Sequence, residues 1–194
     1  MSEIIHERPG VYSSYDASTI VSGGRAVRTV GVAAKAVSGT AGQVMTLTSY
    51  SAGVAAFGED LAESPGMSTL LRLLFSNGAA TVMAVRVGET GDTAAYEAAF
   101  QALGREDVQI MICDSSVLEV QQALRSAVED ASSSRRERIA LVGGNGDTTT
   151  ELVERASALN SERMALVGPD VLSSTGAELP GVFAAAALAG VVAC

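Results

Sequence analysis

The fold is decided by the stretch VQIMICDSSVLEVQQALRSAVEDASSSRRERIALV, residues 108–142. It opens on the apolar run Val108–Cys113 and closes on a second one, Ile139–Val142. Nearly continuous apolar runs of this kind are typical of strands that are buried on both faces of a parallel sheet. Between them, residues 116–131 carry apolar side chains at positions 117, 120, 124, 127 and 128, the spacing of a helix with one apolar face. The stretch therefore predicts a strand, a helix and a second strand.

The same alternation continues on both sides of this stretch. Toward the C-terminus it predicts a helix at 149–159, another buried strand at Met164–Val167 and a last helix at about 180–192. Toward the N-terminus it predicts strands at 28–37, 44–48 and 81–87 and helices at 51–57, 68–75 and 93–103. We therefore expect an α/β fold, an open sheet with helices on both faces and mostly parallel strands from about residue 80 onward.

Residues 1–25 differ from the rest and predict an extended N-terminal arm, followed by an α/β core domain over residues 26–192. The arm has turn-forming prolines and glycines, several strand-forming side chains and no helical period. No hairpin partner lies nearby in the sequence, so a strand in the arm gains most by adding to the sheet edge of a neighbouring copy. The residues that we expect in this intersubunit arm are Pro9, Gly10, Val11, Tyr12, Tyr15, Ile20 and Val21.

Composition and charge argue against several classes of protein. The 194-residue chain is 47% hydrophobic and 18% charged, which is enough to bury a core of ordinary size. Its net charge of -9 argues against a sequence-independent grip on nucleic acid, which needs a basic face. The first residues lack the basic and apolar regions of a secretion signal. The longest apolar run, residues 182–194, is too short to span a bilayer. We expect a soluble protein with no nucleic acid partner and no membrane insertion of its own.

The strongest sign of an enzyme is the turn Gly143-Gly144-Asn145-Gly146, between a predicted strand and a predicted helix. Glycines at such a turn let the backbone approach a pyrophosphate, and Asp170 lies about where a ribose-binding acid would fall. The third glycine of the dinucleotide motif is replaced by Thr149, however, and the turn follows a late strand. Two interpretations stay open: a Rossmann-like nucleotide-binding site at Gly143–Gly146, or a plain strand–helix loop with Asp147 or Thr148 as N-cap.

Other catalytic or metal-binding sets are nearly absent from the sequence. His6 is the only histidine and lies in the predicted arm, which disfavours a nucleophile–histidine pair. Three arginines, Arg135, Arg136 and Arg138, follow a predicted helix. A solvated surface is the default interpretation for them, and a charged interface with an acidic patch of a neighbouring subunit is the alternative. We expect no cofactor and no enzymatic activity.

Three stretches carry a resemblance to a known family. They are ERPGVY at residues 7–12, RTVGVAA and VMTLTS within residues 28–49, and LLRLLFSNGAATVMAVRV at residues 70–87. Together they resemble the N-terminal portion of contractile tail sheath proteins, the family of phage tail sheaths, R-type bacteriocins and related contractile injection systems. The resemblance is clear over residues 7–87 and continues at the level of the fold to about residue 192.

The resemblance implies a structural subunit without catalysis. Such subunits polymerise in rings around a tail tube, exchange terminal arms as strands, and contract to drive the tube through a target cell envelope. The implied partners are other copies of the chain, the tail tube protein, and baseplate and tail-terminator proteins. The implied location is the bacterial cytoplasm, then a virion tail or a released contractile particle. Sheath chains run on past the position of Cys194, so we expect an incomplete core domain. Its last helix is apolar nearly all round, as in a helix buried on every side, and without a later segment to cover it we expect it to expose a large apolar patch.

Overall fold

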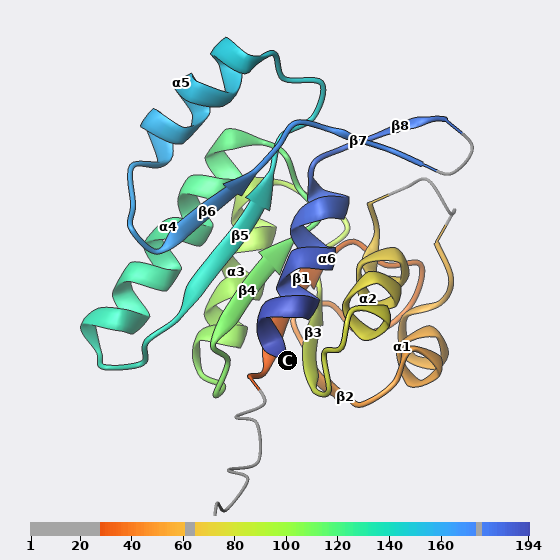
Figure 1. The fold of residues 1–194 in the computed structure, drawn as a ribbon. Coiled ribbons are helices and arrows are strands. Elements are labelled where there is room, and N and C mark those ends of the chain that lie inside the picture. The colour runs from red at the N-terminus through yellow and green to blue at the C-terminus, as the bar shows by residue number, and fades with distance from the viewer. Residues whose placement is uncertain (1–27, 61–64, 174–175) are drawn as a thin grey trace, which may run out of the picture.

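The computed structural model describes residues 28–60, 65–173 and 176–194. In these residues six strands form one sheet in the order β2-β3-β1-β4-β5-β6 (Figure 1). All are mutually parallel except β2, which runs antiparallel to β3. The strands are β1 Val30–Ala34, β2 Val44–Leu47, β3 Val82–Arg86, β4 Ile110–Cys113, β5 Ile139–Gly143 and β6 Met164–Val167. A separate short hairpin, β7 Val171–Leu172 and β8 Glu178–Leu179, follows β6.

Helices cover both faces of this sheet. They are α1 Tyr50–Phe57, α2 Met67–Ser76, α3 Thr93–Gly104, α4 Leu118–Ser133, α5 Thr149–Leu159 and α6 Val182–Ala193. α1, α2 and α6 lie on one face, and α3 and α4 on the other, with α5 beside α4 at the β6 end (Figure 1). The predicted fold class, an open α/β sheet with mostly parallel strands and helices on both faces, is therefore confirmed. The predicted arm, residues 1–25, lies outside the described residues.

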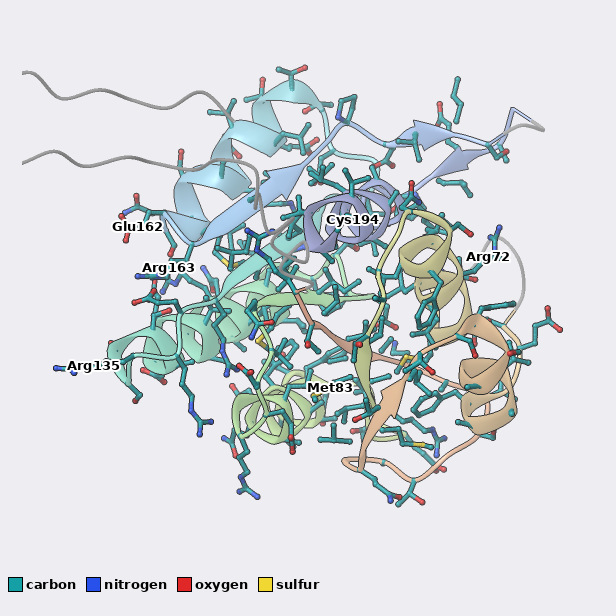
Figure 2. The ribbon with its side chains drawn as sticks, turned by 60° about the horizontal axis from the view of Figure 1, so that its bottom comes forward. Arg72, Met83, Arg135, Glu162, Arg163 and Cys194 are labelled. Carbon is teal, nitrogen blue, oxygen red and sulfur yellow. The ribbon has the colours of Figure 1, made fainter. Side chains whose placement is uncertain are left out.

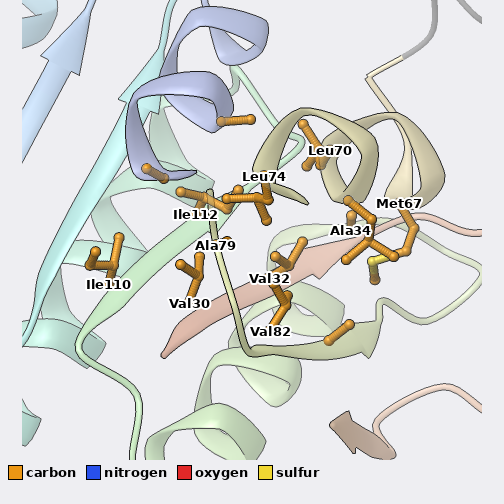
Figure 3. Close-up of a cluster of buried hydrophobic side chains, with 14 of the residues drawn as sticks. Val30, Val32, Ala34, Met67, Leu70, Leu74, Ala79, Val82, Ile110 and Ile112 are labelled. Atoms are coloured by element: carbon orange, nitrogen blue, oxygen red, sulfur yellow. The ribbon is translucent and has the colours of Figure 1, made fainter. Parts of the chain in front are cut away.

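One core layer lies between the sheet and the helices α1, α2 and α6. Val30 and Val32 of β1 pack here with Leu70 and Leu74 of α2, and none of the four has exposed surface (Figure 3). α6 approaches α2 closely because residue 190 is a glycine. A Cβ at Gly190 would lie only 2.7 Å from the carbonyl oxygen of Leu74. The contact therefore depends on the missing side chain.

The second core layer lies between the sheet and the helices α3 and α4. Tyr96 and Phe100 of α3 are buried there with ring centroids 6.1 Å apart. Ala33 of β1, Met111 of β4 and Leu124 of α4 belong to the same buried cluster. Because β1 and β4 have a packed layer on each face, both strands need apolar side chains at nearly every position.

One expectation about burial is wrong, and one small element was not predicted. β6 is the last strand of the sheet, and none of its residues is buried. α6 packs against the sheet and α2, and its outer side leaves Leu188 41% and Val191 54% exposed, which agrees with the apolar surface expected on this helix. An apolar sequence does not say which side of an element will be covered. The strands β7 and β8 are two residues long, too short to show an alternating pattern.

Candidate functional sites at the carboxyl edge of the sheet

The first candidate site is a cleft between the carboxyl ends of β1 and β4. The strand order reverses there, because β3 pairs with one side of β1 and the next strand along the chain, β4, pairs with the other side. Ligands of open α/β sheets bind at such switch points. The cleft has a volume of about 400 Å³, and its polar lining includes Lys35, Asp60, Tyr96, Asp114 and Ser115.

Asp114 is the buried acid of this cleft, only 7% exposed. One carboxylate oxygen accepts a hydrogen bond from the Tyr96 hydroxyl at 2.5 Å, and the other accepts one from the backbone N–H of Lys35 at 3.0 Å. Burial raises the pKa of the Asp114 carboxyl, against these hydrogen bonds, which lower it. Burial and the neighbouring Asp114 charge also raise the pKa of Tyr96 and raise that of Cys113 to about 12. The thiol of Cys113 is therefore a poor nucleophile at neutral pH.

Asp60, which also lines the cleft, holds the start of α2. Its carboxylate accepts hydrogen bonds from the backbone N–H groups of Ser68 at 2.6 Å and Thr69 at 3.4 Å. The hydroxyl of Ser68 accepts a hydrogen bond in return from the backbone N–H of Asp60, at 2.8 Å. Such reciprocal bonds satisfy N–H groups that a helix start leaves open. Both acids of the cleft thus serve the fold.

The cleft was not predicted from the sequence, although one signal was available. Asp114 directly follows a buried strand, and polar residues at the carboxyl ends of parallel strands gather at one edge. No group of three or more metal-binding side chains occurs among the residues that the structure describes. His6 lies outside them.

The second candidate site is the glycine turn after β5. A Cβ at Gly143 would collide with the backbone of Gly181 and Val182, where α6 begins. The carboxylate of Asp170 accepts hydrogen bonds from the backbone N–H of Gly146 at 2.7 Å and of Gly181 at 3.0 Å. The missing side chain at Gly143 therefore leaves room for the start of α6. Asp170, the acid that would hold a ribose in a nucleotide site, instead links the turn to the start of α6.

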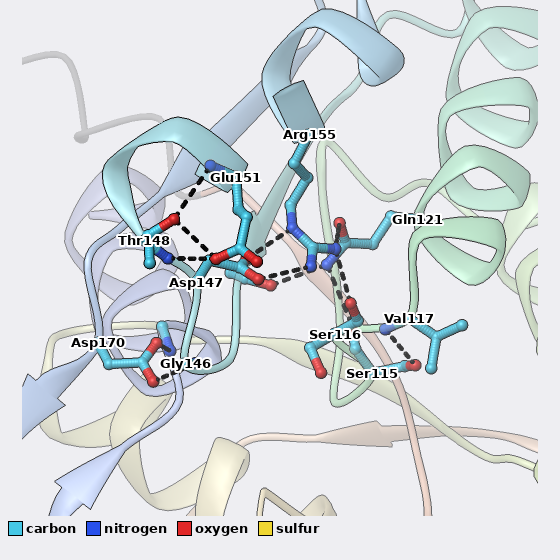
Figure 4. Close-up of polar contacts among 12 residues, drawn as sticks. Ser115, Ser116, Val117, Gln121, Gly146, Asp147, Thr148, Glu151, Arg155 and Asp170 are labelled. Atoms are coloured by element: carbon cyan, nitrogen blue, oxygen red, sulfur yellow. Dashed lines mark hydrogen bonds and ion pairs between the residues drawn. The ribbon is translucent and has the colours of Figure 1, made fainter. Parts of the chain in front are cut away.

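The start of α5 beside this turn is closed by the chain's own carboxylates (Figure 4). Thr148 is the N-cap, as one interpretation predicted, in a capping box with Glu151. Hydrogen bonds from the backbone and side chain of Thr148 lower the pKa of Glu151. Asp147 forms an ion pair with Arg155, with 2.8 Å between Oδ2 and Nε. With Asp170 these acids place negative charge where a nucleotide would place its phosphates, so the residues at the turn do not fit a dinucleotide.

The three arginines of the predicted charged interface have different surroundings. Arg135 is exposed at the end of α4 (Figure 2). The Arg136 guanidinium donates to the carbonyl oxygens of Gly104 at 3.0 Å and Arg105 at 3.1 Å. Arg138 is only 3% exposed and donates to carbonyl oxygens at the same end of α3, the nearest that of Glu106 at 3.0 Å. Burial lowers its pKa. Arg136 and Arg138 thus neutralise the C-terminus of α3, while the interface role stays a prediction.

Two further expectations concern the ends of the chain. Pro9, Gly10, Val11, Tyr12, Tyr15, Ile20 and Val21, the predicted arm residues, lie outside the described part, so their role also stays a prediction. Among the described helices, none has the length and apolar character that crossing a membrane requires.

Solved structures resemble this architecture, whereas no protein-family model and no curated protein matches the sequence. The helical sheath of the anti-feeding prophage (AFP) in its contracted state is 20% identical, with a TM-score of 0.60 over 97% of this chain and 52% of that chain. The sheath tail protein of Desulfitobacterium hafniense is 11% identical, with a TM-score of 0.62 over 95% of this chain and 62% of that one. The sheath tail protein of Listeria innocua is 12% identical, with a TM-score of 0.64 over 87% and 57%.

These similarities concern the fold and only part of each relative. The chain spans 52% to 62% of the lengths of the three sheath proteins, while almost all of its own residues are matched in two of them. The chain therefore has the fold of tail sheath proteins.

Proposed function

We propose that this chain is a structural subunit of a contractile tail sheath, which polymerises with copies of itself in rings around a tail tube. Contraction of the polymer drives the tube through a target cell envelope. The observation that carries the proposal is the structural match to sheath proteins over up to 97% of the chain. The proposed partners are further copies, the tail tube protein, and baseplate and tail-terminator proteins. The proposed path runs from the bacterial cytoplasm to a virion tail or a released contractile particle.

A structural role without catalysis agrees with how the described polar residues are used. The buried carboxylate of Asp114 is held by Tyr96 and Lys35, and Asp60 begins a helix. Around the glycine turn, Asp170 holds two backbone N–H groups. A catalytic acid or base must reach a substrate proton, and the best-placed candidates here accept hydrogen bonds from the chain's own backbone N–H groups and, for Asp114, from the Tyr96 hydroxyl as well. We therefore propose that the chain is not an enzyme.

Electron microscopy of the purified full-length chain tests the proposal directly. We expect tubular or ring-shaped polymers with a regular axial repeat, alone or after addition of the matching tube protein. Irregular aggregates, or a monomer that never assembles with the tube protein, would contradict a sheath role.

The rival nucleotide-binding interpretation has its own test. Titration of NAD, NADP or ATP during thermal unfolding should leave the midpoint unchanged. A genuine site would stabilise the fold by about 2.7 kcal/mol at one hundred times the dissociation constant. That stabilisation would raise the midpoint by several degrees in a domain of this size. A reproducible rise that is lost in Gly146→Asp would restore the nucleotide site.

A further inference from the structure

Four arginines line one polar pocket at the edge of the sheet where the parallel strands begin. The pocket has a volume of about 350 Å³ and is formed by residues 105–108, between α3 and β4, and residues 135–138, between α4 and β5. These two loops lie side by side because β4 pairs with β5. We call it the arginine pocket, after Arg105, Arg135, Arg136 and Arg138. In a chain whose net charge is -9, such a local cluster of positive charge attracts anions.

The acids of the pocket do not balance this charge. None of the four arginines forms an ion pair within the described residues, although three acids also line the pocket. Glu137 pairs instead with Arg163, and the Asp107 carboxylate accepts a hydrogen bond from the side-chain amide of Gln109 at 2.7 Å. With Glu137 neutralised by Arg163, four arginines against Glu106 and Asp107 leave a formal charge of +2. The pocket is therefore electropositive.

Arg138 is the buried member of the lining, only 3% exposed. Its two terminal nitrogens donate to carbonyl oxygens at the end of α3, whereas its Nε is buried and has no hydrogen-bond partner in the part of the chain that the structure describes. Burial, and next the charge of Arg136, lower the pKa of Arg138. Buried charged donors rarely lack a partner, and a bound ion is one kind of partner. An anion in the pocket would stabilise this charge.

Arg135 occupies a backbone position that usually belongs to glycine. Its φ is 62°, in the left-handed region, directly after the last turn of α4. Its N–H donates to the carbonyl of Ser132 at 2.9 Å, and that of Arg136 donates to the carbonyl of Ala131 at 2.9 Å, which together form a Schellman motif. A residue with a Cβ is disfavoured in this conformation, and such strain gathers at functional sites. The strained turn leaves Arg135 and Arg136 both lining the pocket.

The exposed arginines keep donors that the fold does not use. Nη1 of Arg136 donates to the carbonyls of Gly104 and Arg105, at 3.0 and 3.1 Å, and so fixes this guanidinium at the pocket. Among residues 28–60, 65–173 and 176–194, no group accepts a hydrogen bond from the side chains of Arg105 and Arg135. Guanidinium groups bind carboxylate and phosphate oxygens with two parallel hydrogen bonds. Several of them around one pocket suit a compact anion that has several oxygens.

We propose that the arginine pocket binds a small, multiply charged oxyanion of the phosphate class, held by the guanidinium groups of Arg105, Arg135 and Arg136. The charge of the buried Arg138 adds to the attraction. The pocket lies within one copy of the chain, so this inference goes beyond the proposed sheath role and does not depend on assembly.

Calorimetric titration of inorganic phosphate onto the full-length chain, at a concentration below assembly, is the first test. We expect saturable binding by the original chain. The double variant Arg105→Gln/Arg135→Gly should bind at least about tenfold more weakly, because it loses hydrogen bonds to a charged ligand. The matched control is Arg72→Gln, since Arg72 is exposed on α2 at the other face of the sheet (Figure 2). No saturable binding by the original chain, or equal binding by the double variant, overturns the inference.

Thermal unfolding separates a binding role of Arg135 from a structural one. Glycine adopts the left-handed conformation freely, so Arg135→Gly should unfold at nearly the same temperature as the original chain when phosphate is absent. Phosphate at about ten times its dissociation constant should raise the midpoint of the original chain by several degrees, and that of Arg135→Gly by less. The comparison between chains is needed because phosphate also stabilises proteins through exclusion from their surface. Equal rises in the two chains would count against the site.

The Nε–H of Arg138 gives a third readout, on the unaltered chain, by nuclear magnetic resonance. Phosphate should shift this resonance with the dissociation constant found by calorimetry, and chloride at equal ionic strength should not. A chain that binds phosphate but never forms tubes supports the pocket and contradicts only the sheath role. If the original chain forms tubes without binding phosphate, and the double variant does not assemble, the arginines contact another copy. The anion site is then refuted while the sheath role stands.

Discussion

Asp114 is the one acid among the described residues that is buried, and it joins three elements of the fold. It follows β4, its partner Tyr96 lies on α3, and its partner Lys35 follows β1. A carboxylate in this position has the raised pKa that often marks an active site. Here the hydrogen bonds explain the burial without a reaction, because each one ties a neighbouring element to the end of the sheet.

Replacing Tyr96 with phenylalanine should therefore destabilise the fold in a pH-dependent way. The buried carboxylate of Asp114 would lose a donor, at a cost of about 1–3 kcal/mol in the free energy of unfolding at neutral pH. The Tyr96 hydrogen bond lowers the pKa of Asp114, so its loss raises that pKa further. The cost should be small below the pKa of an unfolded aspartate, about 3.9, and should grow as the pH rises through the raised pKa of the folded state.

Urea unfolding at a series of pH values measures this effect. Tyr50→Phe is the matched control, since Tyr50 is a half-buried tyrosine on α1 and its loss should change stability by less than about 0.5 kcal/mol. A cost of Tyr96→Phe that stays constant with pH would show that the hydrogen bond to the ionised carboxylate of Asp114 is not what the substitution removes.

Sequence patterns predicted some single residues of these sites and missed others for a physical reason. Thr148 was a foreseeable N-cap because a cap and its helix are adjacent in the chain. Arg138 was expected on the surface or at an interface, yet the carbonyls that bury it belong to the end of α3, more than thirty residues earlier. A charged run in the sequence does not reveal a partner at that distance.

At the scale of elements, the contact between α2 and α6 depends on one small residue. Gly190→Ala should lower the free energy of unfolding by about 1–3 kcal/mol, because the new methyl group meets the carbonyl of Leu74 in a packed layer. Alanine has the higher helix propensity, so any loss would occur against a local gain. Thermal and urea unfolding measure the change.

The control for this prediction is Gly104→Ala at the end of α3. Apart from its chain neighbours and the backbone of its own helix, no atom lies within 4 Å of a Cβ at Gly104, so alanine should be neutral or stabilise the fold by up to about 1 kcal/mol. If the Gly190 and Gly104 variants were equally stable, the close approach of α2 and α6 would not be needed.

Local pattern predicted the helices and strands of the main sheet, because each of them is long enough to show a helical period or a continuous apolar run. α5 and β6 lie at the predicted residues, and the other boundaries differ by a few positions. The pattern did not predict how far each element is buried. β6 has an apolar sequence like those of the buried strands, but it lies at the edge of the sheet and none of its residues is buried. That position depends on the order of the strands, which no single segment encodes.

At the scale of the whole molecule, the fold is recognisable although little sequence similarity is left. The solved sheath proteins are 11% to 20% identical to this chain, and no family model matches it. Short stretches such as LLRLLFSNGAATVMAVRV were enough to suggest the family because they join a packed helix, a turn and a central strand. They could not indicate the cleft at Asp114 or the place of β6 at the edge of the sheet, which depend on how distant strands meet.

Deletion of the N-terminal arm is a direct test of the proposed sheath role. Both core layers are built from residues between Val30 and Ala193, so the described domain has its own packed interior. Deleting residues 1–21 should therefore leave the circular dichroism spectrum and the urea midpoint nearly unchanged, and Arg28 would keep its bond to Ala193. The same deletion should abolish assembly, because each backbone hydrogen bond of an added strand contributes about 1 kcal/mol and all of them would be lost.

The matched control removes only residues 1–7, which keeps the stretch from Pro9 to Val21, and it should assemble normally. Sedimentation velocity reports assembly, and circular dichroism reports the fold of the same samples. An arm-deleted chain that still forms tubes would show that the arm does not join copies. An arm-deleted chain that unfolds would show that residues 1–21 belong to the domain's own core, since a strand that only bridges two copies can be removed without cost to either.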